Sequence, residues 1–138
     1  MDIIKRNKEL MKKFETMINS ADKNLAEELV ANNAQFFTPA SPDPLYGGAG
    51  YLSVVYWMRQ GFSDVQWHIT DMVADTNKVA IKWNLTGTHD GEFMGIKPTN
   101  KKISVCVMNF YYFNEEGKVI NDIAAEGMIG ILRGIGAI

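Results

Sequence analysis

Two ionisable side chains in this sequence stand where they could take part in proton transfer. His89 lies in a run punctuated by glycines, from Gly87 to Lys102, and it is the only side chain of that run that titrates near neutral pH. Glu126 directly precedes Gly127 towards the end of the chain. If a carboxylate points into an apolar pocket, desolvation raises its pKa and suits it to acid/base work. His89 and Glu126 are therefore the candidate catalytic residues, and the sequence singles out no stronger one.

Both candidates also have a purely structural interpretation. The run that contains His89 is typical of a long hairpin loop. Along the last expected strand, alternation puts Glu126 on the face opposite to Ile123, Ala125 and Gly127, and this second face is the one that we expect to line a pocket. A β-bulge beside Gly127 would be needed to turn Glu126 inward. Without one, Glu126 lies on the outer face of the sheet.

Polar and aromatic side chains supply the other pocket candidates. Asn109 and Tyr111 share one face of the strand expected over residues 103–113. Aromatic walls come from the centre of another strand and from the third helix and the loop before it. We therefore expect a ligand pocket lined by Tyr46, Tyr51, Trp57, Trp83, Asn109, Tyr111, Ile123, Ala125 and Gly127. For each aromatic residue, plain core packing is the alternative.

Other common chemistries have no signature in this chain. Alternation places His68 opposite to its neighbours Trp67 and Ile69, and the two histidines are not spaced as metal ligands are. The run from Gly47 to Gly50 follows a proline-rich loop rather than a strand, so it lacks the context of a dinucleotide-binding loop. We expect neither a metal nor a cofactor. The net charge of −2, without basic residues interleaved with aromatics, indicates no nucleic-acid partner.

The elements that would position these residues follow from the period of the apolar side chains. A period of 3.6 predicts helices over residues 2–19 and 22–31 and a third that follows Gly50 and ends near Gly61; the proline-rich stretch 39–44 reads as an extended loop. Alternation and β-rich composition predict strands over 34–38, 65–70, 79–86, 103–113 and 117–126. Helices followed by a meander indicate a single α+β domain over residues 1–138, in which three N-terminal helices pack on a strongly curved, mostly antiparallel sheet. Such a sheet would form a cone with one pocket.

The strand over residues 103–113 is apolar at nearly every position, so we expect both of its faces to be covered. Three helices on one side of the sheet cannot cover the other side. We therefore expect a homodimer that forms through the outer face of the sheet. Cys106, the only thiol of the chain, lies in this apolar run and is expected to be buried and inert.

Two stretches of the chain resemble the SnoaL-like polyketide (ester) cyclases. They are Gly87-Thr88-His89 with Phe93-Met94-Gly95-Ile96, and the tail Gly130-Ile131-Leu132-Arg133-Gly134-Ile135-Gly136. The resemblance covers nearly the whole chain and implies the cystatin-like cone that this family shares with ketosteroid isomerase and scytalone dehydratase. In the family, an aspartate three residues before the first glycine of the tail is held to act as general acid/base. The ungapped match puts Gly127 at that position, and it puts Ile123 and Gly134 where the family has tryptophan and glutamine.

The resemblance implies a protein that binds a small apolar ligand or substrate. If it is an enzyme, the resemblance implies a cyclase or isomerase that acts on an apolar carbonyl compound without a cofactor. The alternative is a non-catalytic ligand-binding or dimerisation module of the same fold, and the two differ in whether an ionisable group faces the cavity. We expect a cytoplasmic protein with no membrane partner, because the first residues lack the apolar core of a signal peptide and no apolar run approaches a membrane span.

Overall fold

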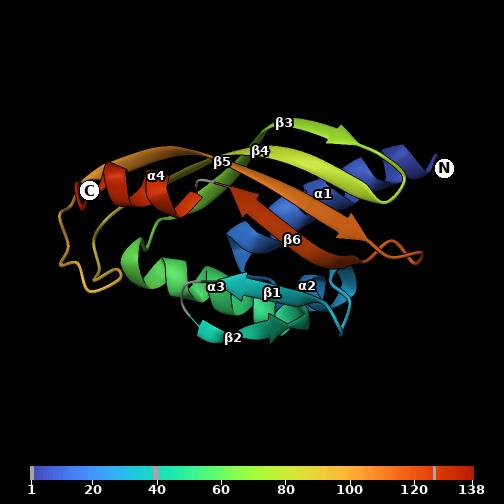
Figure 1. Ribbon diagram of the computed structural model, residues 1–138, viewed down its shortest axis with the longest axis horizontal. Helices are drawn as coiled ribbons and strands as arrows, with labels where there is room; N and C mark the ends of the chain where they lie inside the picture. Colours follow the sequence, from blue (N-terminus) through green and yellow to red (C-terminus); the bar gives the residue numbers. More distant parts are fainter. Residues whose placement is uncertain (1, 39–40, 126) are drawn as a thin grey trace.

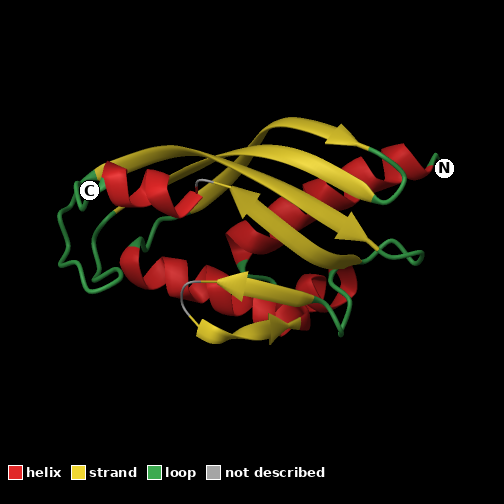
Figure 2. Ribbon diagram, in the orientation of Figure 1, coloured by secondary structure: helices red, strands yellow, loops and turns green. Residues whose placement is uncertain are grey.

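The computed structural model describes residues 2–38, 41–125 and 127–138 of the chain. Its elements follow one another as α1 (Ile3–Ser20), α2 (Lys23–Leu29), β1 (Gln35–Thr38), β2 (Ser41–Tyr46), α3 (Gly47–Gly61), β3 (Gln66–Ala74), β4 (Lys78–Thr88), β5 (Lys102–Phe113), β6 (Val119–Ala125) and α4 (Gly127–Gly134). Figure 2 distinguishes the helices from the strands. Three helices precede an antiparallel meander, which confirms the predicted α+β class.

The main sheet has four antiparallel strands in the order β3-β4-β5-β6. It arches over α1 and α3, so that its inner face is concave (Figure 1). On the helical side, α1 packs against β3 and α2 packs against α3, while α4 covers part of β5. The two-stranded sheet β1-β2 packs against α3. The predicted arrangement of three N-terminal helices on a curved sheet is therefore present.

The first helix forms where the spacing of apolar residues predicts it. Asp2 caps its N-terminus, because the carboxylate accepts a hydrogen bond from the backbone nitrogen of Ile4 at 3.0 Å. Near its C-terminal end, the side chain of Asn19 donates to the carbonyl of Trp67 and accepts from the Trp67 nitrogen, each at 2.8 Å. This pair of bonds ties the helix to the start of β3. The buried face of the helix carries Asn7, Met11, Phe14, Met17 and Ile18.

Within the single chain, no described element covers the outer face of the main sheet, the face for which the sequence predicts a contact with a second copy. Along β5 the odd-numbered residues are buried, whereas Met108 and Phe110 are about half exposed, at 48% and 49%. Cys106 lies on the same outer face and is exposed, so the prediction of a buried thiol is wrong. The reason is that the helices packed on the sheet lie on its concave side.

The proline-rich stretch expected to be an extended loop forms a strand where the structure describes it. β2 pairs with β1 in an antiparallel hairpin, with Gln35 opposite Tyr46 and Phe36 opposite Leu45. A two-stranded hairpin consists of edge strands only, so prolines can be accommodated there without the loss of an internal ladder bond. The chain then enters α3 directly at Gly47, earlier than expected.

The C-terminal tail forms a helix, α4, that the sequence did not indicate. Its three glycines lower the intrinsic helix propensity of the segment. They also allow the helix to lie directly on β5: a Cβ atom at Gly130 would come within 2.4 Å of the Val105 Cγ1 atom. The close packing of α4 on the sheet thus requires glycine, and glycine is also the residue type that makes the segment look unlike a helix in the sequence. Among the described helices, none is long and apolar enough to cross a membrane.

Candidate functional site

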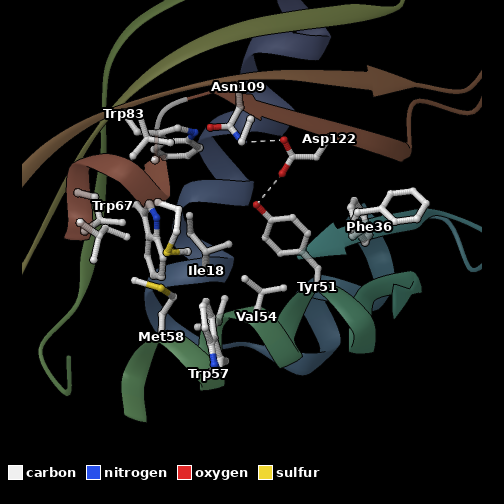
Figure 3. Close-up of a pocket in the computed structure, with 18 of the residues that line it drawn as sticks. Ile18, Phe36, Tyr51, Val54, Trp57, Met58, Trp67, Trp83, Asn109 and Asp122 are labelled. Atoms are coloured by element: carbon white, nitrogen blue, oxygen red, sulfur yellow. Dashed lines mark hydrogen bonds between the residues drawn. The ribbon is translucent and has the colours of Figure 1, made fainter. Parts of the chain in front are cut away.

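A cavity of about 470 Å³ lies between the concave face of the sheet and the helices beneath it. Figure 3 shows the polar side chains Asn109 and Asp122 at the sheet, and the apolar side chains of Val54, Trp57 and Met58 on the opposite side, at α3. A volume of this size is in the range of small-molecule sites. The lining residues are Ile18, Phe36, Phe37, Tyr51, Val54, Val55, Trp57, Met58, Trp67, Trp83, Leu85, Val107, Asn109, Tyr111, Asp122, Ala124, Gly127, Met128, Ile129 and Ile131.

Among the described residues that line this cavity, Asp122 on β6 supplies the carboxylate. Asn109 Nδ2 donates a hydrogen bond to Asp122 Oδ1 at 2.7 Å, and the Tyr51 hydroxyl donates one to Asp122 Oδ2 at 3.1 Å. Burial raises the pKa of Asp122 to about 6, whereas the hydrogen bonds from Asn109 and Tyr51 lower it and so limit the shift. A carboxyl group with a pKa close to neutrality can both accept and return a proton at physiological pH.

Two further groups extend this contact into a directed chain of hydrogen bonds. Trp83 Nε1, which can only donate, lies 3.2 Å from the Tyr111 hydroxyl oxygen. The Tyr111 and Tyr51 oxygens are 3.4 Å apart, and because the Tyr51 proton is directed to Asp122, Tyr111 is the donor of this pair. Burial raises the pKa of Tyr51 and of Tyr111 well above the usual value, so both phenols stay protonated.

Aromatic rings fix Tyr51 in this position. Its ring meets Phe14 edge-on with centroids 4.8 Å apart, and it meets Phe36 edge-on at 4.9 Å. Such T-shaped contacts are a favourable geometry for aromatic pairs. Since α1, β1 and α3 each contribute one ring, three elements together determine where the Tyr51 hydroxyl lies.

The structure brings six of the nine expected pocket residues to the cavity. These are Tyr51, Trp57, Trp83, Asn109, Tyr111 and Gly127. Two others lie elsewhere: Tyr46 is 53% exposed and does not line the cavity, and Ile123 is 54% exposed on the outer face of the sheet. For the ninth, Ala125, the structure describes the backbone on β6 but not the side chain.

The expected face of β6 is reversed because of a β-bulge. Val119 lies opposite Phe113 and Asn121 lies opposite Tyr112, so Ile120 is an extra residue on β6. Simple alternation from the buried Val119 would direct residue 123 inward; the bulge shifts the phase by one residue and directs Asp122 and Ala124 inward instead. The sequence analysis missed Asp122 for this reason. The available signal was that this strand carries a single carboxylate within an otherwise uncharged segment.

Of the two candidate catalysts from the sequence, the structure describes only His89, and it does not place His89 at the cavity. His89 is fully buried, but it does not line the cavity. Its Nδ1 atom accepts a hydrogen bond from the Thr99 nitrogen at 3.1 Å and lies 2.9 Å from the Thr99 hydroxyl, so it holds together the two ends of the loop beside α3 (Figure 1). Glu126 lies outside the described residues. Within the part of the chain that is described, no group of three or more His, Cys, Asp or Glu side chains could hold a metal ion.

Fold and site together define a cone-shaped α+β protein with a half-buried carboxylate in an aromatic cavity. The sequence matches the family model of the SnoaL-like polyketide cyclases over residues 8–135, and the chain belongs to that family. No curated protein matches the sequence.

Three solved structures share this fold over 94% or more of both chains. TsrD from Streptomyces laurentii superposes with a TM-score of 0.84 at 18% identity, covering 100% of this chain and 99% of TsrD. A candidate SnoaL-like polyketide cyclase from Jannaschia sp. CCS1 gives a TM-score of 0.84 at 16% identity, covering 100% and 96% of the two chains. Wild-type IdmH from Streptomyces antibioticus superposes with a TM-score of 0.77 at 23% identity, covering 94% of this chain and 98% of IdmH. At these identities the likeness establishes the fold alone.

Proposed function

We propose that this protein binds a small, flat, largely apolar carbonyl compound in the cavity and that Asp122 acts on it as a general acid/base. The observation that carries the proposal is the Asp122 carboxylate, which lies in the aromatic cavity with a pKa raised by burial to about 6. Raised carboxyl pKa values in clefts are typical of groups that transfer protons. The reaction class is proton abstraction next to a carbonyl, as in an isomerase or cyclase.

The proposed step keeps atoms and charge in balance. At pH 7 Asp122 is mostly ionised, since its pKa is about 6. Its carboxylate removes a proton from the carbon next to the substrate carbonyl, which leaves an enolate and a neutral carboxylic acid. The acid then returns the proton to carbon, at the same position or at another. In ring closure, the enolate carbon instead attacks a second carbonyl of the same molecule, and the alkoxide that forms takes the proton from Asp122.

The carboxylate at position 122 takes the place of the one that the family resemblance implies at position 127. Gly127 is the first residue of α4 and lines the same cavity as Asp122. A side chain at position 127 would start beside Val107, because a Cβ atom there would lie 3.1 Å from the Val107 Cγ1 atom. We propose that the acid/base function has moved from α4 to β6 and that the cavity itself is retained.

Exchange of carbon-bound hydrogen tests this proposal without knowledge of the natural substrate. 2-Tetralone, a small aromatic ketone, exchanges the protons beside its carbonyl in D2O, and NMR measures the rate. We expect the protein to accelerate the exchange, and the isosteric variant Asp122→Asn to lose about 100-fold or more of the acceleration, as for other general bases. Acceleration that survives in Asp122→Asn would refute the role of Asp122. Binding of tetralone without acceleration would favour the non-catalytic ligand-binding module.

We propose in addition that two copies of the chain associate through the outer face of the main sheet. Val73, Ala80, Phe110 and Ile123 lie directly opposite one another across the four strands and form one apolar row. Three of these side chains are about half exposed or more, at 68% for Val73, 49% for Phe110 and 54% for Ile123. An exposed apolar row on the outer face of the sheet supports a symmetric contact with a second copy.

A further inference from the structure

Asn109 carries an acceptor atom that the protein itself does not use. Its side chain is 9% exposed and lines the cavity, and its nitrogen donates to Asp122. Its oxygen, Oδ1, is buried and accepts no hydrogen bond from any of the described residues. Buried amide oxygens are usually paired, because an unpaired one loses its hydration without compensation. An exception within a cavity indicates a partner that is supplied from outside the chain.

The orientation of the Asn109 amide is determined by its neighbour. Asn109 Nδ2 lies 2.7 Å from Asp122 Oδ1. If the amide were turned around, its oxygen would lie at about this distance from Asp122 Oδ1 instead. Two oxygens that both carry lone pairs repel at this distance, so the nitrogen stays towards Asp122 while that carboxylate is ionised. Asn109 Oδ1 is consequently held as an acceptor in the fully formed fold.

The hydrogen-bond donors next to Asn109 are already engaged. Trp83 donates to Tyr111, Tyr111 donates to Tyr51, and Tyr51 donates to Asp122. Trp83, Tyr111, Tyr51, Asp122 and Asn109 form a polar cluster at the sheet end of the cavity (Figure 3). Within this cluster, Asn109 Oδ1 is a buried acceptor to which no described residue donates. The other end of the cavity, at α3, presents the apolar side chains of Val54, Trp57 and Met58.

We propose that Asn109 selects ligands that carry a hydrogen-bond donor, a hydroxyl or N–H group, at the end that approaches Asp122. The inference rests on the proposed binding of a flat ligand in the cavity. It specifies that the ligand is an aromatic compound with a hydroxyl or N–H group rather than a plain hydrocarbon or ether. The donor binds Asn109 Oδ1, and this contact orients the reacting end of the ligand towards the carboxylate. The apolar body lies against α3.

Three related probes test this selection: 2-naphthol, 2-methoxynaphthalene and naphthalene, with affinities measured by calorimetry at pH 7.5. We expect 2-naphthol to bind the unmodified protein about tenfold more tightly than its methyl ether, which has no donor. In Asn109→Leu, which keeps the branch at the γ-carbon and replaces the amide by two methyl groups, the ratio should fall to about one. If Asn109→Leu melts at a lower temperature than the unmodified protein, the variant Asn109→Ala is used in its place, because it removes the amide without adding bulk.

The variant Asp122→Ala tests whether the 2-naphthol hydroxyl binds Asn109 or the neighbouring carboxylate. It keeps the amide of Asn109, but the amide loses the hydrogen bond that fixes its orientation, so a reduced preference for 2-naphthol should remain. Loss of the preference in Asp122→Ala together with its survival in Asn109→Leu would overturn the proposal. So would equal affinities of 2-naphthol and its ether for the unmodified protein, an outcome that leaves the tetralone exchange by Asp122 unaffected. If none of the three probes binds, the proposal that the cavity binds flat apolar ligands is refuted as well.

Discussion

The hydroxyl of Tyr51 on α3 donates a hydrogen bond to the carboxylate of Asp122 on β6 across 3.1 Å, although 71 residues separate them in the chain. The contact joins the helical layer to the sheet at the cavity. It also tunes the carboxylate, because a hydrogen bond to the ionised form opposes the effect of burial. The acid/base character proposed for Asp122 thus depends on a residue of another element.

Removal of this hydroxyl should raise the pKa of Asp122. In Tyr51→Phe the burial of the carboxyl group persists, while one of the two hydrogen bonds that lower its pKa is lost. Titration of the labelled Asp122 carboxyl carbon by NMR measures the change directly. Tyr56→Phe is the matched control, because Tyr56 lies on the same helix and is exposed. A pKa that is unchanged or lowered in Tyr51→Phe would contradict the assigned hydrogen bond.

Asp122 should also make the folded state less stable as the pH rises. Its pKa is raised from 3.8 to about 6 on folding, so between these values the folded state binds more protons than the unfolded state. The free energy of unfolding therefore falls through this window and loses about 3 kcal/mol or less. Asp122→Asn removes this dependence, and it should be more stable than the unmodified protein at pH 7 but not at pH 4.

The comparison of the two proteins isolates Asp122 from other carboxylates. Hydrogen bonds from Thr88 lower the pKa of Asp64, an effect that acts in the opposite direction and is present in both proteins. Urea unfolding at several pH values between 4 and 7 gives the difference in free energy at each. A difference that does not change with pH would show that burial does not raise the pKa of Asp122.

Gly130→Ala should destabilise the protein by about 1–2 kcal/mol. The new methyl group would lie 2.4 Å from the Val105 Cγ1 atom, and overpacking costs about 1–3 kcal/mol, which exceeds the roughly 1 kcal/mol gained in helix propensity. In a Val105→Ala background the space exists, and the same substitution should stabilise α4. Thermal or urea unfolding of the four proteins measures the coupling. Additive effects would contradict the packing of α4 on β5.

Phe110→Lys should convert the proposed dimer into monomers. The substitution places a charge in the middle of the apolar row on the outer face of the sheet, far from the cavity-lining side of β5. Tyr56→Lys, at an exposed site on α3, serves as the control. Light scattering at micromolar concentration gives the mass of each. A monomeric unmodified protein would refute the association itself.

Most of the fold and part of the site could be predicted from the sequence. The alternation along β5 correctly placed Asn109 and Tyr111 on one face, because that strand pairs with β4 without a register shift. The same reasoning failed on β6, where the bulge at Ile120 changes which residues point inward and brings Asp122 to the cavity. A bulge depends on the pairing with a neighbouring strand, and the sequence of one strand does not encode it locally.

The most direct test of the account is the pH dependence of 2-tetralone exchange, measured on the unmodified protein and on Tyr51→Phe. The rate should rise with the ionisation of Asp122, with an inflection near its pKa of about 6, and it should level off above that pH. In Tyr51→Phe the inflection should move to higher pH, in step with the NMR titration. A protein-dependent rate without an inflection near pH 6, or an inflection that Tyr51→Phe leaves in place, would contradict the assignment of Asp122 as the general base.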